Sequence, residues 1–408
     1  MKLSETVLLN NALDCCFLNR THTSEWQTTR VNFGRDTLVI TGEDGCRKFQ
    51  KAIDQLLEGG IGRKVSSDYL INDVYERVYK KLKASQRFDE SDGRALREDI
   101  KSLPLKAVRV IRDVKGAAIS NISGPLRLGE FTFYEWKRHL RAIKETVDQQ
   151  DGFSNTILDS ASHDLVVECV VEASDDQKAE ELAEQKFNKL EALIKFMIGV
   201  RGTDYEFGIV NYAGLRRNFS YIIDDGGVRL NIRSEGAIRD LMLDSDYFVN
   251  PRKSFARLIN IDEGGASNLE RKILRSVEWI SQALSEVSSA SSFVKTSIAL
   301  EVLFSSNEKG VVSPSLMAKF SEGCAYILGE SAKECIAIEK DIKYLYGVRS
   351  AVVHSGKSEV DREDLDRFIA YVRKVIMRLL DQEQYAGMGS IEQLNMFLLE
   401  RKYQGVPA

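Results

Sequence analysis

The stretch LYGVRSAVVHSG, which runs from Leu345 to Gly356, contains an arginine and a histidine five positions apart in an otherwise apolar segment. Its aliphatic residues recur at helical intervals, which predicts a helix with one side in the core. A glycine just after the last turn is a common C-terminal cap, so the helix is expected to end near Gly356. Arg349 and His354 are polar side chains in an apolar helix, which makes them the best candidates for chemistry in the chain.

The two side chains have complementary chemistry. His354 falls in the last helical turn, where the negative end of the helix dipole favours the protonated imidazole. A histidine can move protons near neutral pH, and an arginine fork binds phosphate and stabilises a crowded anionic transition state. Together they suit metal-free attack of an RNA 2′-hydroxyl on its own phosphate. The alternative is structural, with Arg349 in a surface ion pair with Asp341 or Glu339 and a histidine that ends a helix.

Helical geometry separates the two candidates. Five residues at 3.6 residues per turn place Arg349 and His354 roughly 140° apart around the axis. One straight helix therefore does not bring them onto one spot. A long arginine side chain, a distorted helix end or a second copy of the protein could do so.

Helical patterns fill the chain after Pro251, where strand signals stop. Apolar residues recur at helical spacing in the segments 268–284, 293–304, 316–328, 332–353, 364–380 and 391–399. Helices with short connections predict an all-α bundle over residues 255–408. The segment 293–304 is apolar nearly all round, which predicts a central buried helix. Its Glu301 either pairs with Arg349 or another basic residue, or reaches solvent, and both interpretations stay open.

Residues 1–250 mix helix and strand patterns. They predict a mixed α/β region over residues 1–155 and a small α+β domain over 156–250, so the fold class is a multidomain α+β N-terminal region followed by a helical bundle. A hairpin is expected around the turn at residues 34–36. Arg216 and Arg217 are expected in a loop, as a solvated charge pair or as a phosphate contact. His139 is interpreted as an ordinary surface or packing histidine.

Composition excludes several classes of protein. The 408 residues are 43% hydrophobic and 29% charged with a net charge of −4, which is not typical of a protein that coats nucleic acid. The six cysteines form no Cys-x-x-Cys pair, so no zinc site is expected, and they fit a reducing, cytoplasmic setting. No signal peptide, membrane-spanning run or phosphate-binding glycine loop is recognised, and no cofactor is expected.

The C-terminal third resembles the HEPN superfamily, in particular the ApeA-like HEPN domains. The resemblance covers roughly residues 265–385 and is carried by three stretches, 279–284, 297–304 and 345–356. The family signature is an arginine, a usually polar residue, a few variable positions and a histidine. Arg349, Ser350 and His354 match this form, although the family often has Asn, Asp or His where this chain has Ser350.

The resemblance implies a helical bundle that forms a homodimer and places two Arg/His pairs around one cleft. It also implies a metal-independent endoribonuclease, often of a toxin or antiphage defence system, that acts on RNA such as tRNA. In this interpretation His354 is the general base or acid, Arg349 holds the scissile phosphate, Ser350 orients one of them, and Glu301 supports the site. The N-terminal region would then sense a trigger, for example a phage-derived molecule or a nucleotide.

Two alternatives to a ribonuclease remain. The bundle could be a catalytically inactive HEPN-like module that dimerises and binds RNA or a nucleotide. It could also be an unrelated helical scaffold.

Overall fold

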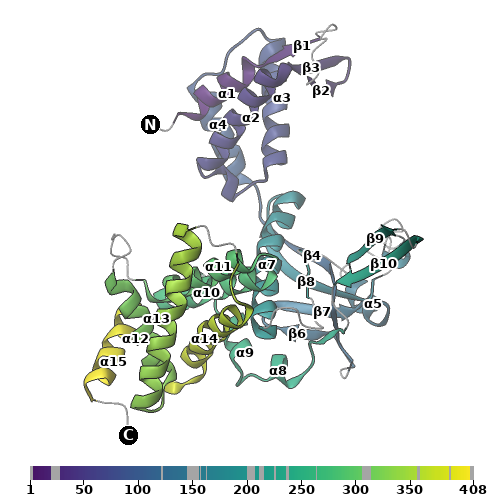
Figure 1. Ribbon diagram of the computed structural model, residues 1–408. Helices are drawn as coiled ribbons and strands as arrows, with labels where there is room; N and C mark the ends of the chain where they lie inside the picture. The colour runs from purple at the N-terminus through teal and green to yellow at the C-terminus, as the bar shows by residue number, and fades with distance from the viewer. Residues whose placement is uncertain are drawn as a thin grey trace. The chain divides into compact units, whose positions relative to one another are not determined.

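A computed structural model of the chain describes most of its residues (Figure 1). At residues 28, 216–224, 227–235, 314–316 and 355, only the backbone is described. The described residues are 3–19, 28–120, 123–144, 156, 158–161, 163–199, 207–210, 216–224, 227–235, 239–262, 264–305, 314–355, 359–385 and 387–404.

Contacts between residues divide the chain into two compact units. The first unit comprises residues 1–110 and 169–185, and the second comprises residues 111–168 and 186–408. This division differs from the three domains expected from the sequence. Strands from both sides of the boundary expected at residue 155 pair in one sheet, so the chain does not separate at that point.

The first unit packs helices against a small antiparallel sheet of order β1-β3-β2. The expected hairpin is present, with Phe33 opposite Asp36 and Gly34 at a φ of +64°. The core is formed by apolar side chains of the helices, including Ile53, Leu70 and Val74, which are fully buried. The elements are α1 (Glu5–Leu13), β1 (Cys16–Leu18), β2 (Thr28–Phe33), β3 (Asp36–Thr41), α2 (Gly42–Glu58), η1 (Ile61–Arg63), α3 (Ser67–Lys83) and α4 (Glu90–Ser102).

The first unit also contains the start of the long helix α7 (Asp176–Ile198). Asp175 directly precedes this helix, and its carboxylate accepts hydrogen bonds from the backbone N–H groups of Ser66 and Lys178, at 3.1 Å and 2.9 Å. Burial opposes the ionised form, but these hydrogen bonds outweigh it and hold the pKa of Asp175 below its usual value. One carboxylate therefore caps α7 and contacts the start of α3.

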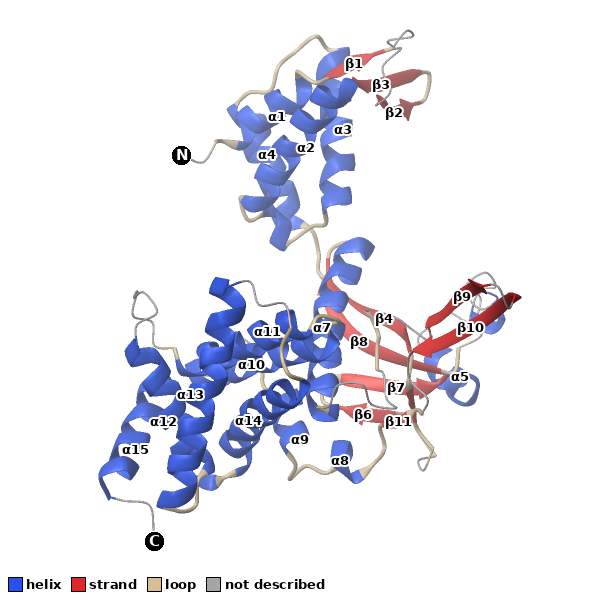
Figure 2. Ribbon diagram, viewed as in Figure 1, coloured by secondary structure: helices blue, strands red, loops and turns tan. Residues whose placement is uncertain are grey.

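A four-stranded sheet of order β4-β8-β7-β6 lies beside α7 (Figure 2). β7 pairs antiparallel with β8, with Phe133 opposite Val167, and both of these side chains are fully buried. The ring of Phe187 on α7 lies 6.3 Å from the ring of Phe131 on β7, which packs the helix onto the sheet. The elements are β4 (Lys106–Val114), β6 (Leu126–Leu128), β7 (Phe131–Glu135), α5 (Trp136–Lys144) and β8 (Leu165–Ala173).

Further strands follow α7 along the chain. β9 (Arg216–Asp224) and β10 (Gly227–Glu235) form an antiparallel hairpin, and β11 (Leu241–Met242) pairs parallel to β5 (Ala117–Ala118). The prediction that Arg216 and Arg217 lie in a loop is therefore wrong, because both belong to β9. The strand begins at Arg216, three residues before Phe219, which is its first apolar residue.

His139 has a packing role. It is 6% exposed, its Nδ1 accepts a hydrogen bond from the Glu135 N–H at 3.1 Å, and its ring lies edge-on to Tyr134. His139 is therefore a packing histidine, which was one of the two expected possibilities, and its buried Nε2 makes no hydrogen bond with a described residue.

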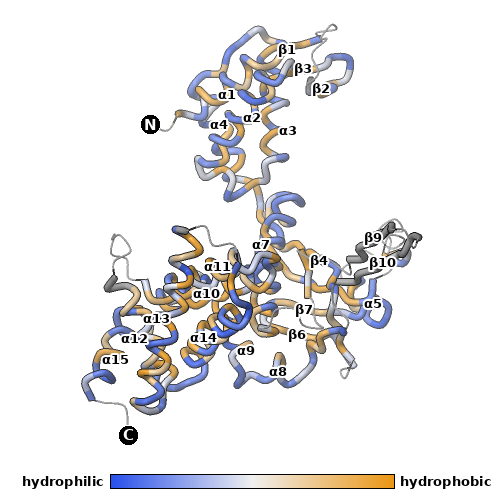
Figure 3. Tube along the Cα trace, in the orientation of Figure 1, coloured by the Kyte–Doolittle hydropathy of each residue, from blue (hydrophilic) through white to orange (hydrophobic). Residues whose placement is uncertain are grey.

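The C-terminal part of the second unit is helical, as expected. All six predicted helical segments are helices, and α11 is buried through Phe293, Leu300 and Leu303. Hydrophobic residues are frequent along α10, α11 and α14 (Figure 3), and each of these helices has a set of buried apolar side chains. The helices are α8 (Asp246–Val249), α9 (Ser254–Ile259), α10 (Asn268–Ser285), α11 (Ser289–Phe304), α12 (Pro314–Leu328), α13 (Ala332–Ser355), α14 (Arg362–Asp381), η2 (Glu383–Tyr385) and α15 (Ile391–Gln404).

Hydrogen bonds join the C-terminal end of α7 to α14. Arg373 donates hydrogen bonds to the carbonyls of Phe196, Met197 and Gly199, at 2.9, 3.1 and 3.2 Å. Gly199 has a φ of +70°, and a Cβ atom at this position would overlap the Arg373 guanidinium. Arg373 thus donates to carbonyl groups of the last turn of α7, which have no N–H partner within the helix. Among the described helices, every one is too short or too polar to cross a membrane.

Candidate functional site

Arg349 points from α13 towards the buried helix α11. Its Nη2 lies 3.2 Å from Oε1 of Glu301, and its Nε makes a long contact of 3.4 Å with Oγ of Ser297. Ser297 donates its own hydroxyl proton to the Val294 carbonyl at 2.7 Å, which leaves the Ser297 oxygen as the acceptor for Arg349. The side chains of Arg349 and Glu301 are 17% and 24% exposed, so the ion pair is largely shielded from water.

Tyr346 completes this cluster one helical turn before Arg349. Its hydroxyl donates to the same Glu301 oxygen at 2.8 Å, and the Arg349 Cζ lies 5.5 Å from the centre of its ring. Burial, together with the hydrogen bond to Glu301, raises the pKa of Tyr346 to about 12. Phe320 of α12 packs on the other part of the ring, with 5.9 Å between ring centroids. The phenol therefore stays protonated near neutral pH and remains a donor to Glu301.

The alternative prediction, a surface ion pair of Arg349 with Asp341 or Glu339, is wrong. Asp341 contacts Arg367 at 3.1 Å, and Glu339 contacts Lys343, so neither forms the expected pair with Arg349. The partner is Glu301, which was one of the two possibilities for that carboxylate. Glu301 and Ser297 are four residues apart on one face of α11, a spacing that brings both to the same neighbour.

His354 and Ser350 lie on the outside of α13. Both are exposed, and His354 makes no hydrogen bond or ion pair with any described residue. Arg349 turns inwards while His354 faces outwards, in line with the roughly 140° between them on a regular helix. The structure therefore does not bring the two candidates together within one chain. The expected cap, Gly356, lies outside the described residues.

The free edge of Arg349 determines what the site can bind. Nε and Nη2 make the polar contacts to α11, whereas Nη1 makes no hydrogen bond or ion pair with the residues that the structure describes. A guanidinium held along one edge keeps donors on the other for an anionic group. An exposed imidazole one and a half turns later can exchange protons with a ligand or with water. The two side chains therefore have the chemistry for phosphate binding and for proton transfer, on different faces of one helix.

Sequence reasoning missed Tyr346 and Ser297 as members of the cluster. Tyr346 precedes Arg349 by three residues, so a shared helix face was visible in the sequence. Ser297 could be found only as a small polar residue four positions before Glu301 in an apolar helix. Neither signal names the partner helix, because contacts between α11 and α13 join residues about fifty positions apart.

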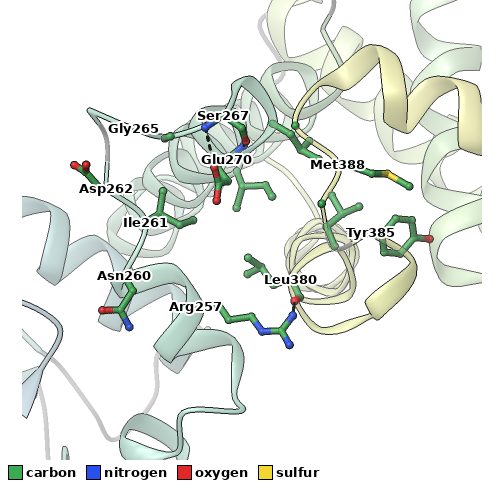
Figure 4. A pocket seen from close by; sticks show the side chains of 16 residues that line it. Arg257, Asn260, Ile261, Asp262, Gly265, Ser267, Glu270, Leu380, Tyr385 and Met388 are labelled. Carbon is green, nitrogen blue, oxygen red and sulfur yellow. Dashed lines mark hydrogen bonds between the residues drawn. The ribbon is translucent and has the colours of Figure 1, made fainter.

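A separate cavity of about 610 Å³ lies between α9, the start of α10 and the end of α14 (Figure 4). Its polar groups already have protein partners: Arg257 donates to the Leu380 carbonyl, and Glu270 accepts from the Ser267 N–H at 2.7 Å. The Tyr385 hydroxyl points away from the cavity. None of the four predicted site residues lines this cavity, so it is not part of the Arg349 site.

Comparison with models of protein families, with curated proteins and with solved structures finds no match to this chain.

Proposed function

We propose that the protein is a HEPN-like, metal-independent endoribonuclease whose site is formed by Arg349 and His354. The observation that carries this proposal is the orientation of Arg349. Glu301 and Ser297 hold the guanidinium through Nη2 and Nε, Nη1 makes no hydrogen bond or ion pair with a described residue, and the same helix ends near the exposed His354. Such an arrangement suits phosphate binding beside a proton-transfer group.

The reaction needs no group beyond these side chains and the RNA. The 2′-oxygen attacks the adjacent phosphorus, and its proton passes to a neutral His354 imidazole. The bond from phosphorus to the 5′-oxygen breaks, and the imidazolium gives that proton to the leaving 5′-oxygen. The products are a 2′,3′-cyclic phosphate and a 5′-hydroxyl. Arg349 stabilises the extra negative charge on the phosphate oxygens during the transfer.

We propose that two copies of the chain form the site as a homodimer. Arg349 and His354 of one chain point apart, so each site needs the arginine of one chain and the histidine of the other. The outer face of α13 is open: Gly347, Ser350 and Val353 are exposed, and a Cβ atom at Gly347 would meet nothing within 4 Å. A second α13 packed on this face would place one chain's His354 beside Gly347 and Ser350 of the other chain, in the helical turn that carries Arg349. Ser350 would then lie within the dimer contact, where it can orient either group.

The remaining roles rest on the resemblance to ApeA-like HEPN domains. We propose a cytoplasmic effector of a toxin or antiphage defence system that cuts cellular RNA, with tRNA as a candidate substrate. Residues 1–250 would recognise the trigger, such as a phage-derived molecule or a nucleotide. A HEPN-like module without turnover, which dimerises and binds RNA, is the second candidate, favoured by the neutralisation of Arg349 by Glu301.

The test is cleavage of total RNA and of tRNA in EDTA by the wild-type protein, His354→Ala and Arg349→Ala. Arg362→Ala is the matched control, because Arg362 is 75% exposed on α14 and lies outside the cluster. We expect cleavage by the wild type and the control, and a loss of at least about 100-fold in both site variants. Equal cleavage by all four proteins would reject the assignment. RNA binding without cleavage by any of them would favour the inactive module.

A further inference from the structure

We propose that Tyr346 is a positioning residue of this site, which orients Arg349 by fixing the carboxylate of Glu301. The inference rests on the proposed ribonuclease function and assigns a role to a residue that need not touch RNA. Tyr346 is 7% exposed, and its contacts on three helices define where its hydroxyl can point.

The ring of Tyr346 is held by packing. Phe320 of α12 contacts it with 5.9 Å between centroids, and the Arg349 guanidinium lies 5.5 Å from its centre. A buried ring with a neighbour on α12 and a cation on α13 has little freedom to turn. Its hydroxyl is therefore a fixed donor, directed at α11.

The hydroxyl and the guanidinium share one acceptor. Tyr346 Oη and Arg349 Nη2 lie 2.8 Å and 3.2 Å from Oε1 of Glu301. A glutamate side chain has several rotatable bonds, and one ion-pair contact leaves it free to swing. A second, rigid donor on the same oxygen selects one carboxylate position. The plane of the Arg349 fork follows from that position and from the Nε contact to Ser297.

Glu301 has opposite effects on the alignment of Arg349 and on the attraction of Arg349 for RNA. Glu301 carries a negative charge beside the phosphate-binding arginine, so it weakens the attraction for RNA while it aligns the fork. Loss of alignment should lower kcat, because misplacement of about an ångström at a reacting centre costs up to about 100-fold. Loss of the carboxylate should leave KM unchanged or lower it, because the local charge becomes more positive. A general folding defect would not produce this split.

Tyr346→Phe tests the hydroxyl alone, because it keeps the packed ring. We expect kcat for RNA cleavage to fall about 10-fold with KM unchanged within about twofold. Tyr344→Phe is the matched control on the same helix: Tyr344 is 55% exposed and its hydroxyl donates to Asp364 at 2.9 Å, away from Glu301. The control should retain the wild-type kcat.

A double variant tests the route through Glu301. If Tyr346 acts only by holding that carboxylate, Tyr346→Phe should cost nothing further in a Glu301→Ala background. We expect Glu301→Ala and the double variant to have the same kcat, about 10- to 100-fold below the wild type, with KM equal to or below that of the wild type. A kcat in the double variant reduced by the product of the two single reductions would show that Tyr346 does not act through Glu301.

A spectrum of arginine side chains gives a readout that does not require turnover. In protein labelled with ¹⁵N-arginine, the Nε–H resonance of Arg349 is identified by its absence in Arg349→Lys. It should shift in Tyr346→Phe and stay in place in Tyr344→Phe. Cleavage that is lost in His354→Ala but retained at the wild-type rate in Tyr346→Phe would overturn the positioning role and leave the proposed function intact. Equal cleavage by wild type and His354→Ala would reject the function, and an unmoved Arg349 resonance in Tyr346→Phe would then reject the positioning role separately.

Discussion

Arg349 of α13 and Glu301 of α11 face each other with 3.2 Å between guanidinium and carboxylate, and both side chains are less than a quarter exposed. Surface ion pairs contribute little to stability because water screens them, whereas loss of one partner of a shielded pair leaves a charge without compensation. The pair is therefore part of the packing between two core helices. It also leaves Nη1 as the guanidinium nitrogen without a hydrogen bond or ion pair to a described residue.

Removal of Glu301 should destabilise the protein more than removal of an exposed carboxylate. We expect Glu301→Ala to lower the free energy of unfolding by about 1–3 kcal/mol, because Arg349 and the Tyr346 hydroxyl both lose their acceptor. Urea unfolding measures this difference. Glu330→Ala is the control, since Glu330 is 73% exposed in its pair with Arg378 and should cost below about 1 kcal/mol. Equal losses in the two variants would contradict a shielded pair.

Gly199→Ala should release Arg373 from the end of α7. The added Cβ would overlap the guanidinium, and the residue has a φ of +70°, so we expect a loss of about 2–4 kcal/mol in urea unfolding. Gly387→Ala is the control for the backbone effect alone, because Gly387 has a φ of +88° but open space around its Cβ position. We expect it to lower the free energy of unfolding by about 1 kcal/mol. Arg373→Ala combined with Gly199→Ala should cost less than the two single losses added together.

The contribution of Asp175 to stability should depend on pH. Its pKa is lowered in the folded state, so its stabilisation is fully present above the unfolded value of about 3.9 and is lost as pH falls through the folded value. Asp175→Asn should therefore be less stable than the wild type at pH 7, and the gap should narrow below about pH 4. Asp176→Asn, at the exposed neighbouring position, should stay within about 0.5 kcal/mol of the wild type at pH 7. A gap for Asp175→Asn that is constant down to pH 2 would contradict the capping role.

Gly347→Gln should block the proposed dimer without disturbing the fold. The Cβ position at Gly347 is open, so the monomer accommodates the side chain, whereas a second α13 packed on this face would not. Sedimentation of the wild type should show a dimer, and the variant should be a monomer that has lost RNA cleavage. Lys101→Gln, at an exposed position of α4, should remain a dimer. A dimeric, active Gly347→Gln protein would place the interface elsewhere.

The sequence predicts local features of this fold better than distant ones. Apolar spacing located the bundle helices, including the buried α11, because each helix carries its own periodic pattern. The sheet order β4-β8-β7-β6 could not be obtained in this way, because it joins strands separated by helices and loops. Arg216 and Arg217 were assigned to a loop because β9 begins with polar residues, which carry no apolar strand pattern.

The candidate site shows the same limit. Arg349 and His354 stand out as polar residues in an apolar helix, and the angle between them follows from helix geometry alone. The partners of Arg349 do not, because the choice among Glu301, Asp341 and Glu339 depends on which helix packs beside α13. Asp341 and Glu339 have their own cations, and only the folded chain reveals this.

Cleavage of RNA in EDTA by the wild type and by a mixture of two inactive variants tests the central claim most directly. His354→Ala and Arg349→Ala should each be inactive alone. Mixed and allowed to exchange subunits, they should recover about a quarter of the wild-type activity, because half of the dimers are mixed and each restores one of two sites. Activity in the mixture no greater than that of the separate variants would contradict a site shared between two chains. Cleavage by His354→Ala alone at the wild-type rate would contradict the site itself.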